Sequence, residues 1–237
     1  MFLKDTVLPK HINDFKINKD AAIKIQKLFN NESISNLYIY GPSGCGKYSL
    51  FIKNLESMVG KELVIVPKTI AISNQWASIK ETTILSSEYH FEINLSKYSN
   101  NRNTLFSIID TITDSGEVNS ELPFKLVLIR NIHTTSLEFI KFIKQKSEQS
   151  SDYIRFILIG KTNSINSSIL NGSFFCLQMS SPTTEAIKQA IIPITKKKIK
   201  EDALIIIINE SLNNLSSIFT KIDMFMLTNF YRTRLDT

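Results

Sequence analysis

The sequence feature that most constrains the fold is a glycine-rich turn at residues 41–47, within the stretch LYIYGPSGCGKYSL. Four apolar residues, 37–40, precede the turn, and a segment with helical periodicity, 46–58, follows it. The spacing G-x-x-x-x-G-K between a strand and a helix is typical of loops that wrap backbone amides around phosphate oxygens. The chain is therefore expected to join a buried strand directly to a helix, with a phosphate site at the junction.

The rest of the chain alternates in the same way and predicts the α/β class. Four more apolar runs are too short for helices and are bounded by polar or glycine-containing segments, as expected of buried strands: 89–93, 124–129, 154–159 and 174–179. Helical periodicity marks the segments 21–29, 104–113 and 136–146. This alternation predicts a mostly parallel sheet of five core strands, covered by helices on both faces.

The pattern changes after Met179, where Ser181, Pro182 and Thr183 can end the last strand and cap a helix. Three helical segments follow with no strand between them: 184–191, 200–210 and 215–229. We expect an α/β nucleotide-binding domain over residues 1–180 and a small helical domain over residues 181–237.

Composition narrows the class of protein without identifying it. The 237 residues carry a formal net charge of +6, which permits contact with a polyanion but does not require it. No apolar run is long enough to span a membrane, so we expect no membrane partner. The two cysteines, Cys45 and Cys176, lie far apart without metal-ligand spacing and are expected to be reduced, buried thiols.

The turn supplies the candidate nucleotide site. Its lysine would neutralise the β- and γ-phosphates, whereas the next residue, which normally gives Mg²⁺ a hydroxyl, is a tyrosine with a long, rigid phenol. The following serine is rotated by about 100° around the helix, so nucleotide binding survives this change more easily than hydrolysis does. The candidate nucleotide-binding residues are Gly41, Pro42, Ser43, Gly44, Cys45, Gly46, Lys47, Tyr48 and Ser49.

The acidic part of such sites is missing from the expected place. An active site of this kind needs an Asp for the metal and a Glu for water at the end of a neighbouring strand. The candidate strand, 124–129, is followed by Arg130 and Asn131, and no carboxylate appears before Glu138. Because a cation repels a metal and cannot act as a base, we assign no catalytic residue and no metal ligand.

These residues carry a family resemblance that spans nearly the whole chain. The segments LPKHINDF, NLYIYGPSGCGKYS, ETTILSSEYHFEIN and SSILNGSFFCLQMSSPTTEAI resemble, in that order, the small subunits of the eukaryotic clamp loader, replication factor C. The chain looks most like the small subunit that carries a nucleotide but is not counted among the hydrolysing members. In that subunit the loop hydroxyl is displaced by one residue, and Tyr48-Ser49 is similar.

The resemblance implies an AAA+ fold, with an α/β nucleotide domain, a three-helix lid and then a helical collar that holds five subunits in a ring. The sequence ends at Thr237, about where the lid should end, so the collar is expected to be absent. The implied ligand is ATP or ADP, with the need for Mg²⁺ left open.

Five further family positions have lost their usual residues. The amino-terminal Tyr-Arg-Pro that touches the nucleotide corresponds to Val7-Leu8-Pro9, and the acidic box corresponds to Arg130-Asn131. The γ-phosphate sensor falls on Lys161 or Thr162. The Ser-Arg-Cys motif, whose arginine reaches a neighbouring subunit's ATP, falls on Asn171-Gly172-Ser173, and Ser216 replaces the lid arginine. Together these losses imply a subunit that binds nucleotide without hydrolysing it.

The resemblance also implies partners and a compartment. They are the other clamp-loader subunits, the sliding clamp and primer-template DNA reached through the complex, in the nucleus. In this family the helix after the second core strand grips the clamp, which makes Phe106 the candidate clamp contact. Leu105 and Ile109 fit the buried face of an amphipathic helix at least as well.

Two alternatives stay open at this stage. One is a free-standing ATPase or a nucleotide-binding adaptor of DNA replication or repair, with no ring. The other is a loop that no longer binds nucleotide and whose glycines persist only to pack the helix on the strand.

Overall fold

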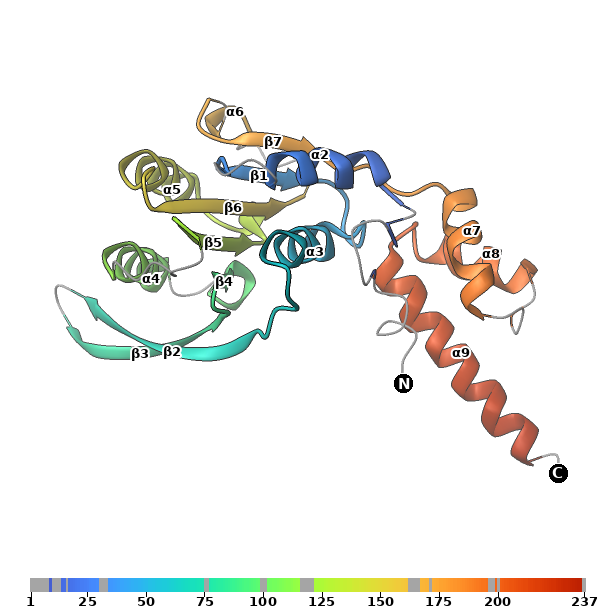
Figure 1. The fold of residues 1–237 in the computed structure, drawn as a ribbon. Helices are drawn as coiled ribbons and strands as arrows, with labels where there is room; N and C mark the ends of the chain where they lie inside the picture. Colours follow the sequence, from blue (N-terminus) through green and yellow to red (C-terminus); the bar gives the residue numbers. More distant parts are fainter. Residues whose placement is uncertain are drawn as a thin grey trace. The chain divides into compact units, whose positions relative to one another are not determined.

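The computed structural model describes residues 9, 14–15, 17–29, 34–74, 77–98, 102–115, 122–161, 167–170, 172–195, 199 and 201–235. Its described residues fall into two compact units. The first unit takes them from Met1–Lys27, Gly41–Val59 and Met179–Thr237, and the second takes them from Leu28–Tyr40 and Gly60–Gln178. The second unit contains the β-sheet, whose twist is visible in Figure 1.

The sheet has seven strands in the order β2-β3-β4-β5-β6-β1-β7. Five of them, from β4 to β7 in that order, run parallel, as the sequence predicted. Near-continuous apolar sequence explains this core, since parallel strands are buried on both faces. The strands are β1 (Leu37–Tyr40), β2 (Val66–Asn74), β3 (Ala77–Ser86), β4 (His90–Asn94), β5 (Lys125–Arg130), β6 (Ile154–Gly160) and β7 (Phe175–Gln178).

Strands β2 and β3 were not predicted. They form a long antiparallel hairpin that extends the sheet beyond β4, visible at its edge in Figure 1. Val66 is 49% exposed, and Pro67 and Lys68 are residues that natural edge strands use against unwanted pairing. Among the described side chains of the hairpin, Ile72, Ile84 and Ser86 are buried, and they do not form a continuous buried run of the kind that identified the core strands.

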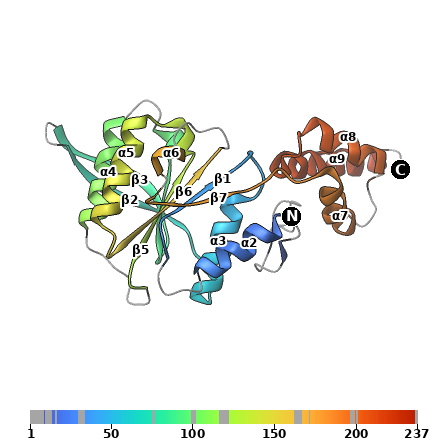
Figure 2. The same ribbon diagram turned by 90° about the horizontal axis from the view of Figure 1, so that it is seen from above.

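Helices α4 (Arg102–Asp114) and α5 (Leu137–Gln149) lie beside each other against this sheet, as Figures 1 and 2 show. Helix α5 begins after Ser136, whose hydroxyl accepts a hydrogen bond from the Phe139 amide and so caps the first turn. The short elements of this unit are η2 (Leu95–Lys97), η3 (Ile132–Thr134) and α6 (Ser167–Leu170).

The three helices predicted after Met179 are confirmed. Helices α7 (Thr184–Thr195), α8 (Glu201–Glu210) and α9 (Leu215–Leu235) follow one another without a strand among the described residues. They enclose a core of their own, formed by Ile187, Ile191, Ile199, Leu204, Ile208, Ile218 and Ile222. The first unit also contains α3 (Lys47–Val59) and the start of α2 (Lys19–Phe29).

One expectation for the cysteines was wrong. Cys45 is buried, 3% exposed, but Cys176 is only half-buried. Cys176 lies on β7, which pairs with β1 alone and is therefore an edge of the sheet. Neither cysteine forms a disulfide.

None of the described helices combines the length and the apolar character needed to cross a bilayer.

Candidate phosphate-binding site

The loop after β1 has a backbone that its glycines make possible. Gly41, Gly44 and Gly46 have φ angles of +154°, +75° and +91°, where L-residues are strained. A Cβ atom on Gly41 would lie 2.2 Å from the carbonyl oxygen of Met179, so no larger residue fits there. Helix α3 begins directly after this loop, and the first amides of a helix have no carbonyl partner within it. The loop and the helix start therefore form a set of backbone donors suited to an anion.

Lys47 lies across this loop. Its Nζ donates hydrogen bonds to the carbonyl oxygens of Gly41, at 2.8 Å, and Pro42, at 2.5 Å, and lies 3.7 Å from Cys45 Sγ. Burial raises the pKa of the Cys45 thiol, although the Lys47 charge opposes this shift. Cys45 is therefore a protonated structural thiol at neutral pH, and the ammonium group is the charged element of the loop.

Tyr48 and Ser49 lie in the first turn of α3, within the helix that the sequence predicted, and both are half-buried. Consecutive helical residues point about 100° apart, so the Ser49 hydroxyl does not replace a hydroxyl at position 48. The phenol of Tyr48 is a poor ligand for Mg²⁺, which prefers compact oxygen donors in octahedral geometry.

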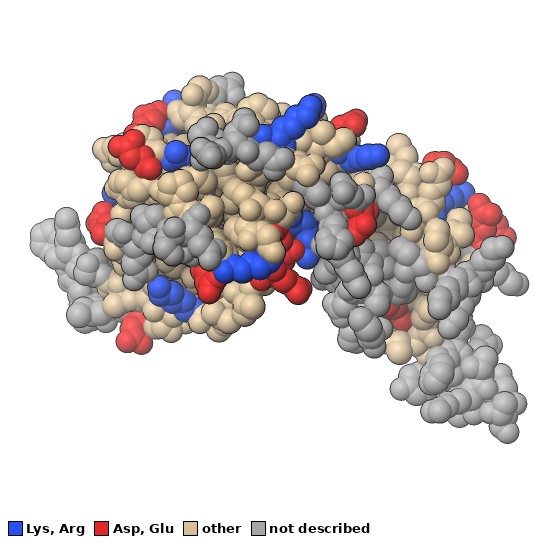
Figure 3. Space-filling model, viewed as in Figure 1, with Lys and Arg blue, Asp and Glu red and all other residues tan. Residues whose placement is uncertain are grey.

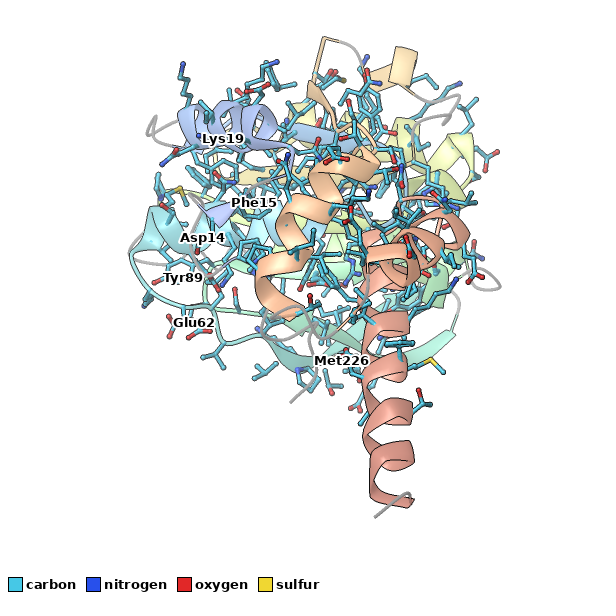
Figure 4. The ribbon with its side chains drawn as sticks, turned by 90° about the vertical axis from the view of Figure 1, so that its right-hand side faces the viewer. Asp14, Phe15, Lys19, Glu62, Tyr89 and Met226 are labelled. Atoms are coloured by element: carbon cyan, nitrogen blue, oxygen red, sulfur yellow. The ribbon has the colours of Figure 1, made fainter. Side chains whose placement is uncertain are left out.

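Two asparagines contact the loop. Neither was identified as part of the site from the sequence. Asn18, directly before Lys19 at the start of α2 (Figure 4), donates from Nδ2 to the carbonyl oxygens of Cys45 at 3.3 Å and Ser180 at 3.2 Å. Asn214 lies against Gly44, since a Cβ atom there would be 1.9 Å from its Oδ1. Both lie far from the loop in sequence, and no local pattern indicated these contacts.

The end of β5 carries a cation where an acidic residue is usual. In the sheet, Arg130 is level with Ile159 and Tyr40 is level with Gly160, so β5 ends at the edge where β1 leads into the loop. Arg130 forms an ion pair of 2.6 Å with Glu92 on β4, whose side chain is 1% exposed. The carboxylate at this edge is thus buried and neutralised.

Glu92 was missed because it stands within the short apolar strand HFEIN, where burial was expected of every residue. A charged residue in such a strand is itself a signal, since buried charges need a partner. A second polar pair lies beside it: Asn131, in the left-handed region with φ 60°, donates from Nδ2 to Asn94 Oδ1 at 2.8 Å. Over the described part of the chain, no group of three or more His, Cys, Asp or Glu residues could hold a metal ion.

His90 is a buried neutral imidazole on the same strand. The Ser87 hydroxyl lies 2.5 Å from its Nδ1 and accepts hydrogen bonds from the amides of Tyr89 and His90, so it donates to the ring. Burial lowers the pKa of His90 to about 4, while the Glu92 charge opposes this shift.

We predict that His90 makes the fold sensitive to acid. The unfolded chain takes up the proton near the ordinary pKa of 6.5, and the folded chain only near 4. Stability is therefore full above pH 6.5 and falls as the pH drops towards 4, by about 3 kcal/mol in total. Urea unfolding between pH 7 and pH 4 measures this loss. His90→Gln should flatten the pH dependence relative to the natural chain, and equal slopes for the two proteins would contradict the prediction.

The remaining predicted positions do not gather into a catalytic set. Lys161 follows β6 and is exposed, while Ser216 is exposed in the first turn of α9. Ser173, at the position of the family's arginine-finger motif, donates from its hydroxyl to Glu148 on α5 at 2.7 Å. Val7, Leu8, Thr162 and Asn171 lie outside the described residues.

Phe106 belongs to an aromatic cluster. Its ring centroid is 5.4 Å from that of Phe139, edge to face, and 4.9 Å from that of Phe142, and its side chain is half-buried. Leu105 and Ile109 are 4% and 1% exposed, so they form the buried face of α4. The assignment of Phe106 as a clamp contact stays a prediction, with only part of the ring at the surface.

Comparison with known sequences supports the resemblance. A protein of Acanthamoeba polyphaga mimivirus, named as a replication factor C small subunit, is 28% identical over 162 residues, covering 67% of this chain and 44% of the relative. Human replication factor C subunit 3 is 24% identical over 200 residues, covering 82% of this chain and 56% of the relative. The chain thus spans about half the length of the curated relatives it matches. No family model matches the sequence.

Solved structures agree on the fold. The Orc1 protein of Aeropyrum pernix, solved in complex with DNA, has a TM-score of 0.57 at 8% identity and covers 90% of this chain and 60% of its own. A RuvB variant of Thermotoga maritima has a TM-score of 0.58 at 15% identity and covers 90% and 63%. The chain resembles replication factor C small subunits in sequence and has the AAA+ P-loop fold.

Proposed function

We propose that this chain acts as a clamp-loader small subunit of the replication factor C kind, which binds ATP or ADP without hydrolysing it. One observation carries the proposal: the chain keeps a complete glycine loop with Lys47, while the end of β5 presents Arg130 paired with buried Glu92. The first half of that observation supports phosphate binding, and the second opposes hydrolysis. The similarity to replication factor C small subunits supplies the setting, which is loading of a sliding clamp during DNA replication.

Nucleotide binding is supported by the loop alone. Three glycines at positive φ, the start of helix α3 and one ammonium group together suit a di- or triphosphate. None of these groups requires a metal. ADP or ATP is therefore expected to bind in the absence of Mg²⁺, with a modest gain when Mg²⁺ is present.

Hydrolysis is opposed by the groups at the strand ends. In-line attack on the γ-phosphate needs a carboxylate to hold the metal and another to position water. Glu92 is buried and held by Arg130, and Arg130 cannot take up a proton from water at neutral pH. We therefore assign the chain a supporting part in an ATPase complex, with the cleavage carried out by other subunits.

The proposed partners are the other clamp-loader subunits, the sliding clamp and, through the complex, primer-template DNA in the nucleus. Charged side chains of both signs are interspersed over the face seen in Figure 3. On this face we therefore assign no separate DNA site, since binding of the DNA backbone calls for clustered lysines and arginines.

Co-purification tests this role. The full chain, tagged and expressed in its own host, should bring down other loader subunits and a ring-shaped clamp. Phe106→Ala should reduce the amount of clamp recovered but not that of the loader subunits, whereas Phe142→Ala, which disturbs the same aromatic cluster from α5, should not. Recovery of a lone monomer would contradict the subunit assignment and favour an adaptor.

A further inference from the structure

The turn between α8 and α9 has an unusual backbone. Leu212 and Asn213 have φ angles of 47° and 58°, in the left-handed region that disfavours side chains. For Leu212 this conformation is strained, and its side chain is 88% exposed, so packing of that side chain does not explain it. The left-handed residues close the end of α8, where the Leu212 amide donates to Asn209 O at 3.1 Å and the Asn213 amide to Ile208 O at 3.4 Å. This turn brings the chain to Asn214.

Both the backbone and the side chain of Asn214 form hydrogen bonds. Its amide donates to Ser211 O at 2.9 Å, and its Oδ1 accepts from the Ser217 amide at 3.2 Å, which makes it the cap of α9. The capping bond fixes the side-chain rotamer. In this orientation the side-chain amide lies directly over Gly44 of the phosphate loop, where a Cβ atom would overlap it.

A backbone hydrogen bond reinforces the contact. The Leu215 amide, the first of α9, donates to Gly44 O at 3.3 Å. This bond holds the Gly44 carbonyl towards α9 and so restrains the backbone of the loop at Gly44. The start of α9 thus supports the loop through one backbone bond and one neutral side chain.

We propose that Asn214 is a positioning residue that couples helix α9 to nucleotide binding at the phosphate loop. This inference rests on the proposed nucleotide binding. In the sequence, Ser216 stands where the family's lid arginine is expected, so the coupling here runs through Gly44 and needs no cation. Because coupling is reciprocal, a nucleotide in the loop also holds the start of α9 in place.

Two substitutions separate this role from simple capping. Serine and aspartate both cap helices as well as asparagine does, so Asn214→Ser and Asn214→Asp should leave α9 formed and the nucleotide-free protein as stable as before. Serine is too short to lie over Gly44 as the asparagine does. Aspartate places a negative charge beside the loop, which opposes a phosphate and is screened by salt.

The experiment measures ADP affinity of the full chain by calorimetry in EDTA, for the natural protein and both variants. Asn214→Asp should weaken ADP binding by about tenfold at low ionic strength, and less at high salt. Asn214→Ser should weaken it by about threefold without that salt dependence. Leu212→Gly is the control, because glycine accepts the same left-handed turn and leaves Asn214 unchanged; its ADP affinity should equal that of the natural protein.

Hydrogen exchange provides the second readout. ADP should slow exchange of the Leu215, Ser216 and Ser217 amides in the natural protein, and this protection should be lost in Asn214→Ser. If the natural protein binds ADP and both variants bind it equally well, Asn214 has no positioning role and the inference is wrong. If the natural protein does not bind ADP at all, the proposed nucleotide binding fails, and this inference fails with it.

Discussion

Lys47→Ala should lower the affinity of the chain for ADP and ATP by about 100-fold, the loss expected when charge-assisted hydrogen bonds to phosphate are removed. The ammonium group is the charged element of the loop, and its bonds to the carbonyls of Gly41 and Pro42 place it at the centre of the turn. Isothermal titration of the purified chain with each nucleotide, with and without Mg²⁺, measures the change. The loss should be the same in both conditions, because the loop's binding groups do not include a metal.

Lys53→Ala is the matched control for this substitution. Lys53 lies on the same helix, almost two turns from the loop, and pairs with Glu56 at 2.5 Å. Its removal changes the net charge equally but should leave nucleotide affinity unchanged. Equal losses in the two variants would show that general charge governs affinity, which would contradict a specific phosphate site at Lys47.

Arg130→Met should destabilise the chain by about 3 kcal/mol, because it leaves a buried carboxylate without its counterion. The Glu92 side chain is 1% exposed, whereas that of Arg130 is 32% exposed, so the cost arises from Glu92. Urea denaturation at pH 7 measures the difference in free energy of unfolding. The midpoint should move to lower urea without a change in the slope.

The double substitution Glu92→Met with Arg130→Met gives the decisive comparison. Replacing a buried ion pair by apolar residues of similar volume is often close to neutral, so the double variant should regain at least half of the stability that Arg130→Met loses. If instead the two losses simply add, the pair is not energetically coupled, and Arg130 is held at the strand end by other contacts.

The five core strands could be predicted because each is a short, mostly apolar run of residues, as expected of a strand that is buried on both faces. The predicted run 154–159 and the observed strand Ile154–Gly160 differ by one residue at one end. The hairpin of β2 and β3 could not be predicted in this way, because Pro67 and Lys68 interrupt it and its apolar residues come in runs of at most three.

The part of the candidate site that lies in one continuous segment could be predicted from the sequence. The contacts between segments far apart in the chain could not. The loop from Gly41 to Lys47 is one continuous motif, so its glycines and lysine could be assigned directly. The sequence also showed that a cation replaces the acid at position 130. It gave no indication that Glu92 is its partner or that Asn18 and Asn214 contact the loop, because these contacts join segments far apart in the chain.

The central claim is that the phosphate loop holds a nucleotide that this chain does not cleave. The most direct test measures ATP turnover by the purified chain with Mg²⁺, with and without primed DNA, beside ADP binding in EDTA. We predict that ADP binds in EDTA and that turnover does not exceed that of Lys47→Ala. Magnesium-dependent ATP cleavage by the isolated chain that disappears in Lys47→Ala would contradict the claim.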